Sequence, residues 1–239
     1  MSKRIFIFIV MAAAWLAVRA QDMIVVELKG SEIVHATNAD FVERIYFQEA
    51  KADTIPEAIN LGLPSGTKWA EWNIGASAPE EYGNYYAWGA TSKKYYYYWN
   101  DYDYASYDSI SGLSVEFIGE DIAGTDYDVA IKKWGGDWVM PTVAQYQELL
   151  DYCTHEWTKV NDVNGVLFTG ANGNTLFLPA AGLIYASSYS YSGSTCYYWS
   201  SSYHAEDSQL AYGLTCSNHN IHCSGDFRFL GRSVRPVSR

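Results

Sequence analysis

Short runs of apolar and polar residues alternate along most of this chain, which is typical of a protein built mainly from short strands. Residues 210–214 alternate large and small side chains and predict a buried strand. A polar run at residues 216–226 follows, and residues 227–237 are aromatic, basic and β-branched. The pattern indicates that residues 196–239 form a scaffold that supports a polar surface.

Two segments instead have the spacing of helices. Residues 126–133 predict a short helix that ends at Gly135 and Gly136, because glycine is a usual helix stop. A second helix should begin at Thr142, since Gln145 lies three residues later and completes a capping box. Its predicted apolar face carries Tyr146, Leu149, Leu150 and Cys153.

The first 54 residues form two segments with different patterns. Residues 1–20 have a basic start, an apolar run and a small residue at Ala20, which predicts a secretory signal peptide and therefore export to the periplasm, the cell surface or the medium. An uncleaved membrane anchor is the alternative, although the apolar run is short for a span and nothing later in the chain approaches one. Residues 21–54 predict a small N-terminal β-hairpin, a third strand and a linker.

Charge and composition narrow the range of partners. Cleavage after residue 20 would remove Lys3, Arg4 and Arg19, so the formal net charge would change from −11 to −14. Nucleic acids and anionic membranes are bound by basic patches, so we expect neither as a partner. The chain has 21 Tyr and 9 Trp, residues that binding surfaces use heavily, although tyrosine is also common in the strands of exported proteins.

Five ordered segments carry a resemblance to a known family. They lie at residues 58–89, 134–142, 172–182, 198–201 and 233–237, and the third contains NGNTLFLPAAG. Together they resemble the bacterial exported family called the Fibrobacter succinogenes major paralogous domain, over about residues 58 to 239. The resemblance implies an α+β, C-type-lectin-like domain at residues 55–239, with two helices packed on short, mostly antiparallel strands, and with the N-terminal β segment as an appendage.

Large rings next to glycines should supply most of the core of this domain. The tryptophans that we expect there are Trp69, Trp72, Trp88, Trp134, Trp138 and Trp199.

A tyrosine-rich stretch at residues 95–108 raises the question of calcium. Trp99, Asn100 and Asp101 copy a tripeptide of sugar-binding C-type lectins, and nearby carboxylates could supply hard oxygen ligands. In those lectins the tripeptide lies late in the domain and works with an earlier Glu-Pro-Asn, which this chain lacks. We therefore predict a solvated, partly ordered insertion and no cofactor, with calcium bound by Asp101, Asp103 and Asp108 as the alternative.

The cysteines allow a second metal hypothesis. Cys216, His219, His222 and Cys223 could form a zinc cluster, but their spacing matches no common zinc finger, and cysteines of an exported chain are equally open to oxidation. Four cysteines allow three complete pairings, and Cys153 is expected to be a free buried thiol.

The residue types near the end of the chain favour a non-catalytic module for ligand binding or display. Within the fold family the functional parallel is the variable protein of diversity-generating retroelements, in which adenine-directed mutagenesis changes a C-terminal surface. Every residue from 216 to 230 belongs to the set that such mutagenesis reaches, although a polar loop could match this set by coincidence. The predicted ligand-binding residues are Ser202, Tyr203, His204, Asn218, His219, Asn220, His222, Asp226, Phe227 and Arg228.

Two alternatives to this function remain. One is an enzyme that resembles the formylglycine-generating or sulfatase-modifying group, with Cys216 and Cys223 as a redox pair, although the motif around that pair is missing. The other is a subunit of an adhesive surface assembly. In the favoured case we expect a monomer that binds a protein or a glycan.

Overall fold

The computed structural model describes residues 23–25, 36–38 and 55–238. The chain divides into two compact units, Met1–Ala52 and Asp53–Arg239. In the first unit, β1 (Met23–Val25) pairs antiparallel with β2 (Ala36–Asn38). The predicted signal peptide at 1–20, the predicted third strand at 42–47 and the linker at 48–54 lie outside the described residues.

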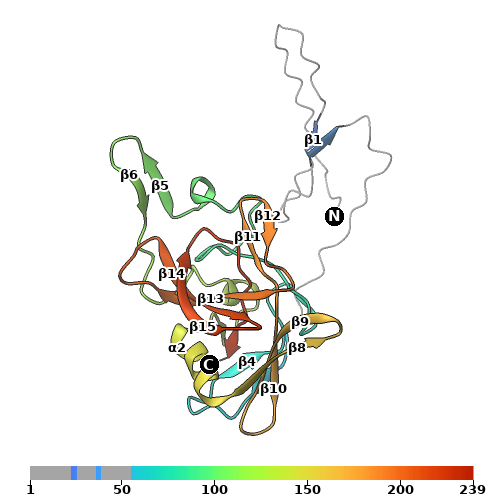
Figure 1. Ribbon diagram of the computed structural model, residues 1–239. Helices are drawn as coiled ribbons and strands as arrows, with labels where there is room; N and C mark the ends of the chain where they lie inside the picture. Colours follow the sequence, from blue (N-terminus) through green and yellow to red (C-terminus); the bar gives the residue numbers. More distant parts are fainter. Residues whose placement is uncertain (1–22, 26–35, 39–54, 239) are drawn as a thin grey trace, which may run out of the picture. The chain divides into compact units, whose positions relative to one another are not determined.

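The second unit is a mixed α+β structure of two short helices and small sheets whose strands pair antiparallel (Figure 1). A four-stranded sheet joins distant parts of the chain in the order β3 (Ala58–Asn60), β4 (Lys68–Ala70), β16 (Val237–Ser238) and β7 (Trp138–Val139). A three-stranded sheet contains β10 (Thr175–Pro179), β9 (Val163–Thr169) and β8 (Thr154–Val160).

A second three-stranded sheet is formed by the region that the hydrophobic pattern singled out. It contains β13 (Thr195–Tyr203), β14 (Leu210–Ser217) and β15 (Ile221–Phe227). The strand predicted at residues 210–214 is therefore confirmed. The polar run at 216–226 is mostly β structure, with a turn between β14 and β15.

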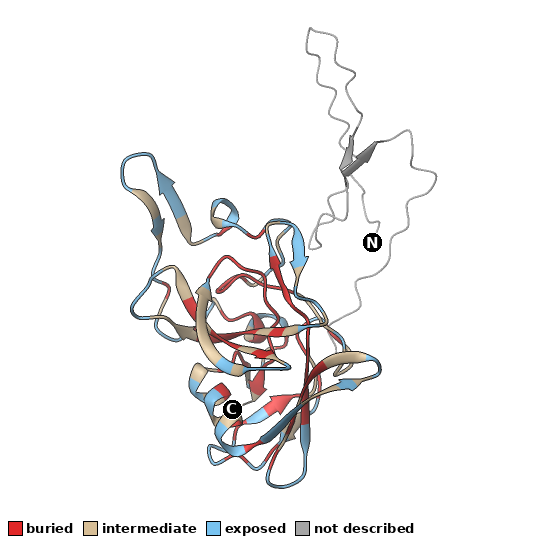
Figure 2. Cartoon of the chain, in the orientation of Figure 1, coloured by how far each residue is buried: buried red, intermediate tan, exposed pale blue. Residues whose placement is uncertain are grey.

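Two hairpins complete the unit. They pair β5 (Ala105–Asp108) with β6 (Gly112–Val115), and β11 (Leu183–Tyr185) with β12 (Ser188–Ser190). Figure 2 shows the β5–β6 hairpin projecting from the body of the unit, with exposed residues along it.

Both predicted helices are present. Helix α1 (Val129–Lys133) begins after Asp128, whose side chain accepts a hydrogen bond from the Ala130 amide, and the chain then turns at Gly135 and Gly136, where φ is +68° and +60°. Helix α2 (Val143–Tyr152) begins at Thr142 with the predicted capping box to Gln145. Its inward face is also as predicted: Tyr146, Leu149 and Cys153 are buried and Leu150 is half-buried.

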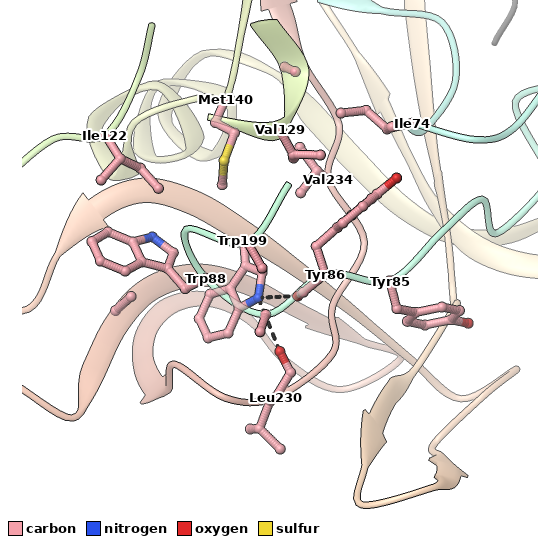
Figure 3. Close-up of a cluster of buried hydrophobic side chains, with 14 of the residues drawn as sticks. Ile74, Tyr85, Tyr86, Trp88, Ile122, Val129, Met140, Trp199, Leu230 and Val234 are labelled. Carbon is pink, nitrogen blue, oxygen red and sulfur yellow. Dashed lines mark hydrogen bonds between the residues drawn. The ribbon is translucent and has the colours of Figure 1, made fainter. Parts of the chain in front are cut away.

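Large aromatic side chains form much of the core. Trp69, Trp88 and Trp199 are completely buried and Trp134 nearly so, whereas Trp72 and Trp138 are half-buried and pack against the core from its rim. The expected core position is therefore confirmed for the first four, whereas Trp72 and Trp138 contribute to the core only in part. Figure 3 shows Trp199 donating from Nε1 to the carbonyls of Tyr86, at 2.9 Å, and Leu230, at 3.3 Å, so that the ring ties two segments together.

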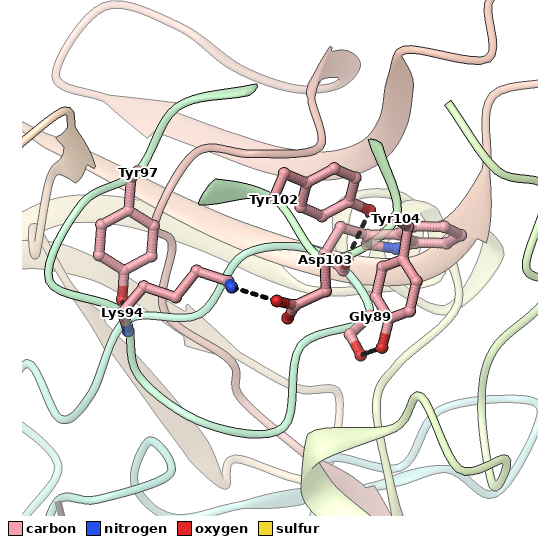
Figure 4. Close-up of polar contacts among 7 residues, drawn as sticks. Gly89, Lys94, Tyr97, Tyr102, Asp103 and Tyr104 are labelled. Atoms are coloured by element: carbon pink, nitrogen blue, oxygen red, sulfur yellow. Dashed lines mark hydrogen bonds and ion pairs between the residues drawn. The ribbon is translucent and has the colours of Figure 1, made fainter. Parts of the chain in front are cut away.

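The tyrosine-rich stretch is more firmly anchored than predicted. It contains a 3-10 helix, η2 (Trp99–Asp101), and the side chains of Tyr97 and Tyr102 are buried. The Tyr102 hydroxyl donates to the Trp88 carbonyl, and Lys94 Nζ lies 2.6 Å from Asp103 Oδ1 (Figure 4). Buried aromatic rings fix this insertion to the core. The number of polar residues next to them in the sequence does not reveal this.

Candidate functional site

The sheet of β13, β14 and β15 has one buried face and one partly exposed face. Residues directly opposite each other in an antiparallel sheet point to the same side. Leu214 is paired with Tyr198 and Cys223, and this row faces the core.

The neighbouring row points to the opposite side, because side chains alternate along a strand. It pairs Tyr197 with Thr215 and Thr215 with His222, and these three side chains are half-buried or exposed. Ser224 and Asp226 follow on the same side of β15. We call the five residues Tyr197, Thr215, His222, Ser224 and Asp226 the polar sheet face.

A cavity of about 580 Å³ adjoins one end of this face. Tyr197 and Asp226 belong both to the polar sheet face and to the cavity wall. Most of the remaining wall is aromatic and comes from segments far apart in the sequence. It includes Tyr98 and Trp99 of the tyrosine-rich stretch, Tyr185 of β11, Tyr191 after β12, and Phe227 and Phe229. We call this space the aromatic cavity.

The aromatic rings of the wall support one another. Phe227 stacks on Phe229 with ring centroids 5.5 Å apart, and Tyr185 lies 6.0 Å from Phe229. In the same wall, the ring centroids of Tyr191 and Tyr197 lie 5.9 Å apart. Rings that are already packed lose little freedom when a ligand binds, so the wall is prepared for contact.

A buried ion pair holds the junction between the polar sheet face and the aromatic cavity. Arg232 is fully buried, and its Nη2 donates to Asp226 Oδ2. The guanidinium also lies over the rings of Tyr197, at 4.9 Å, and Trp199, at 4.4 Å. Burial lowers the pKa of Arg232, and Asp226 opposes that shift by stabilising the charged form.

A glycine makes room for this pair. A Cβ at residue 213 would lie 2.4 Å from the Tyr198 carbonyl oxygen and 2.9 Å from Arg232 Nη1. A side chain there would force the sheet and the buried guanidinium apart, so Gly213 belongs to the framework of the site.

Arg228 corrects one of the predicted contacts. We expected an exposed cation there, but the side chain is fully buried. Its Nε donates to the Tyr102 hydroxyl at 2.8 Å, its Nη1 donates to the carbonyls of Glu116 and Ser208, and the guanidinium lies over Trp88. Arg228 therefore anchors the tyrosine-rich stretch and does not present a charge to a ligand.

The other predicted residues fall into separate groups. Asp226 and Phe227 line the aromatic cavity, and His222 is exposed on the polar sheet face. The exposed turn residues Asn218, His219 and Asn220 lie at the opposite end of β15 from Phe227, a separation of roughly 20 Å at the rise of an extended strand.

The segment at the end of β13 packs away from the aromatic cavity. Ser202 Oγ accepts a hydrogen bond from the Val143 amide at the start of α2, and the Tyr203 ring packs on Phe117 at 5.2 Å. The His204 ring lies 4.7 Å from that of Tyr212. The three residues are half-buried, and none of them lines the aromatic cavity.

Sequence reasoning missed most of the aromatic wall. Tyr98, Tyr185, Tyr191 and Tyr197 were not assigned to the site, although the excess of tyrosine was the signal that pointed to a contact surface. Because three separate segments supply these rings, only the folded chain brings them together.

The cysteines and histidines do not assemble in the way that the zinc and redox hypotheses require. Cys216 and Cys223 point to the core side of the sheet, whereas His222 points to the opposite side. Across the described residues no group of three or more His, Cys, Asp or Glu side chains could hold a metal ion.

All four thiols are free, and burial raises the pKa of Cys216 and raises that of Cys223 to about 11. A thiolate is the reactive form of cysteine, so neither residue has the lowered pKa of a nucleophile.

Two of the three candidate calcium ligands, Asp103 and Asp108, are engaged separately. Asp103 pairs with Lys94, and Asp108 accepts hydrogen bonds from the amides of Ile110 and Ser111 in the β5–β6 turn. Those two amide bonds lower the pKa of the Asp108 carboxyl. These two carboxylates therefore have local structural roles.

Comparisons with family models, with curated proteins and with solved structures find no match to this chain. Within the part of the chain that the structure describes, no helix is long and apolar enough to cross a membrane.

Proposed function

We propose that this chain is an exported, non-catalytic protein for ligand binding or display. It presents a ligand-recognition surface on a C-type-lectin-like scaffold. The observation that carries the proposal is the junction of the polar sheet face with the aromatic cavity, where exposed side chains stand on a fully buried framework. Such an arrangement lowers the ordering cost of binding, because the backbone and most of the rings are already fixed.

Variation by a diversity-generating retroelement is part of this proposal. Residues 218–220, His222 and Phe227 are exposed, so their side chains could change with little effect on the core. Cys216 and residues 228–230 are buried, and a chain diversified in this region would have to keep them. An adhesive surface subunit would use the same surface and differ only in its partner.

The enzyme alternative lacks a supporting observation. Its proposed redox pair, Cys216 and Cys223, consists of thiols whose pKa is raised by burial. We therefore favour binding without turnover.

An array of proteins and glycans probed with residues 21–239 tests the proposal. The parent should bind at least one class of ligand saturably, and Tyr191→Ala and Phe227→Ala should weaken that binding at least fivefold without lowering the melting temperature by more than a few degrees. Tyr107→Ala is the matched control, because Tyr107 is 75 % exposed on the β5–β6 hairpin and does not line the aromatic cavity. Binding that both cavity variants retain in full, or chemical conversion of the ligand, would contradict the proposal.

A further inference from the structure

The chemistry of the aromatic cavity restricts the kind of ligand that it can take. Its open edge is formed by rings that are partly exposed, with 47 % of Tyr185, 60 % of Tyr191 and 43 % of Phe227 accessible to solvent. Partly exposed aromatic rings offer flat apolar surface, which matches a ligand that also has a flat apolar face.

The same wall carries hydroxyl groups that make no hydrogen bond to any residue that the structure describes. Among the described residues, the hydroxyls of Tyr185, Tyr191 and Ser190 make no side-chain hydrogen bond, although all three residues line the aromatic cavity. A purely apolar ligand would cover these groups without satisfying them, which costs free energy. A ligand that carries its own hydroxyls would pair with them.

The charges around the aromatic cavity disfavour an ionic ligand. Asp226 is the charged residue in the wall, and its carboxylate is already compensated by the buried guanidinium of Arg232. That guanidinium also lies over the Tyr197 ring, so this ring has little attraction left for a ligand cation. An anion would find no accessible cation among the residues that line the cavity, because Arg232 is fully buried, and the chain has a formal net charge of −11.

We infer that the aromatic cavity binds a neutral saccharide. A sugar ring combines an apolar C–H face, which stacks on Tyr185 or Tyr191, with hydroxyls that pair with the free tyrosine and serine hydroxyls and with the open lone pairs of Asp226. The volume of about 580 Å³ lies within the range of small-molecule sites. This inference rests on the proposed function, since it names the ligand class of the same surface. Asp226 is the carboxylate that the cavity wall offers, so the inferred recognition is expected to proceed without a metal ion.

Native gel electrophoresis through gels that contain a soluble neutral polysaccharide tests the inference. Starch, galactomannan, xylan and mixed-linkage β-glucan are the probes, and residues 21–239 should be retarded by at least one of them, equally with and without EDTA. Tyr185→Ala and Tyr191→Ala should each weaken the retardation at least fivefold. Tyr191→Phe should keep part of it, because it retains the ring and loses only the hydroxyl.

Tyr107→Ala is again the control and should migrate like the parent, with all variants checked for an unchanged melting temperature. The inference is overturned if no probe retards the parent, if both cavity variants are retarded like the parent, or if EDTA abolishes the effect. If the array identifies a protein ligand and no polysaccharide retards the chain, the inference of a saccharide ligand is wrong but the proposed function stands. Absence of both kinds of binding would remove both proposals.

Discussion

Single residues of the polar sheet face differ in how strongly the core constrains them. Asp226 and His222 lie four residues apart on the same side of β15, but they have different roles. His222 is exposed, whereas the Asp226 carboxylate neutralises a guanidinium that has no access to water. The polar sheet face therefore contains at least one member that stability constrains.

Replacing Asp226 by asparagine should lower the free energy of unfolding by about 2 to 3 kcal/mol, because it leaves the charge of Arg232 buried without a counter-ion. The loss is smaller than for a fully buried pair, since about a third of the Asp226 side chain is exposed. Urea unfolding measures the difference. His222→Ala is the control and should change stability by about 0.5 kcal/mol or less. Equal stabilities for the two variants would show that the ion pair is unimportant.

Arg228 shows what residue-level reasoning cannot supply. Its neighbours in sequence are polar or aromatic, which suggested a surface cation. Its partners Tyr102, Glu116 and Trp88 lie more than 100 residues earlier, and they determine that the guanidinium is enclosed. A buried arginine is predictable only when its distant acceptors and rings are known.

At the scale of elements, the helices depend on local contacts that the sequence displays. The capping box at Thr142 and the glycine stop after α1 involve residues within a few positions of each other, so they could be predicted. The aromatic cavity could not, because β11, β13, β15 and the tyrosine-rich stretch meet there only after the chain has folded.

The two helix caps should contribute unequally to stability. Asp128 accepts from the amides of Ala130 and Gly124, each at 2.8 Å, and of Met140, at 3.0 Å. Asp128→Ala should therefore lower the free energy of unfolding by about 3 kcal/mol, because it removes an N-cap and leaves further buried amide donors without an acceptor. Thr142→Ala removes an ordinary N-cap and should cost about 1 kcal/mol. Denaturant midpoints of both variants give the comparison, and similar losses would disprove the extra role of Asp128.

For the whole molecule, the buried tyrosines make stability depend on pH at the alkaline end. Burial raises the pKa of Tyr85, Tyr102 and Tyr198 above the value of an exposed tyrosine, because a buried phenolate loses its hydration. In the unfolded chain these groups titrate near their ordinary pKa of about 10. Their contribution to stability is therefore complete below that pH and is lost as the pH rises above it.

The melting temperature should consequently fall steeply above about pH 10, while it changes much less between about pH 7 and pH 9. Absorbance of tyrosinate during the same titration should show a late cooperative step that coincides with loss of near-ultraviolet circular dichroism. Ionisation of every tyrosine while the fold stays intact would contradict the assigned burial.

The position of β16 has a consequence for how the protein is made. Val237 pairs with both Trp69 and Val139, and Arg235 bonds to Asn73 and to the carbonyls of Ala70 and Glu71. Because a ribosome delivers residues 58–73 long before residues 235–237, the central sheet cannot close until nearly all of this domain has been synthesised. A chain whose sheet closes so late stays open during most of its synthesis, which suits the export that we propose.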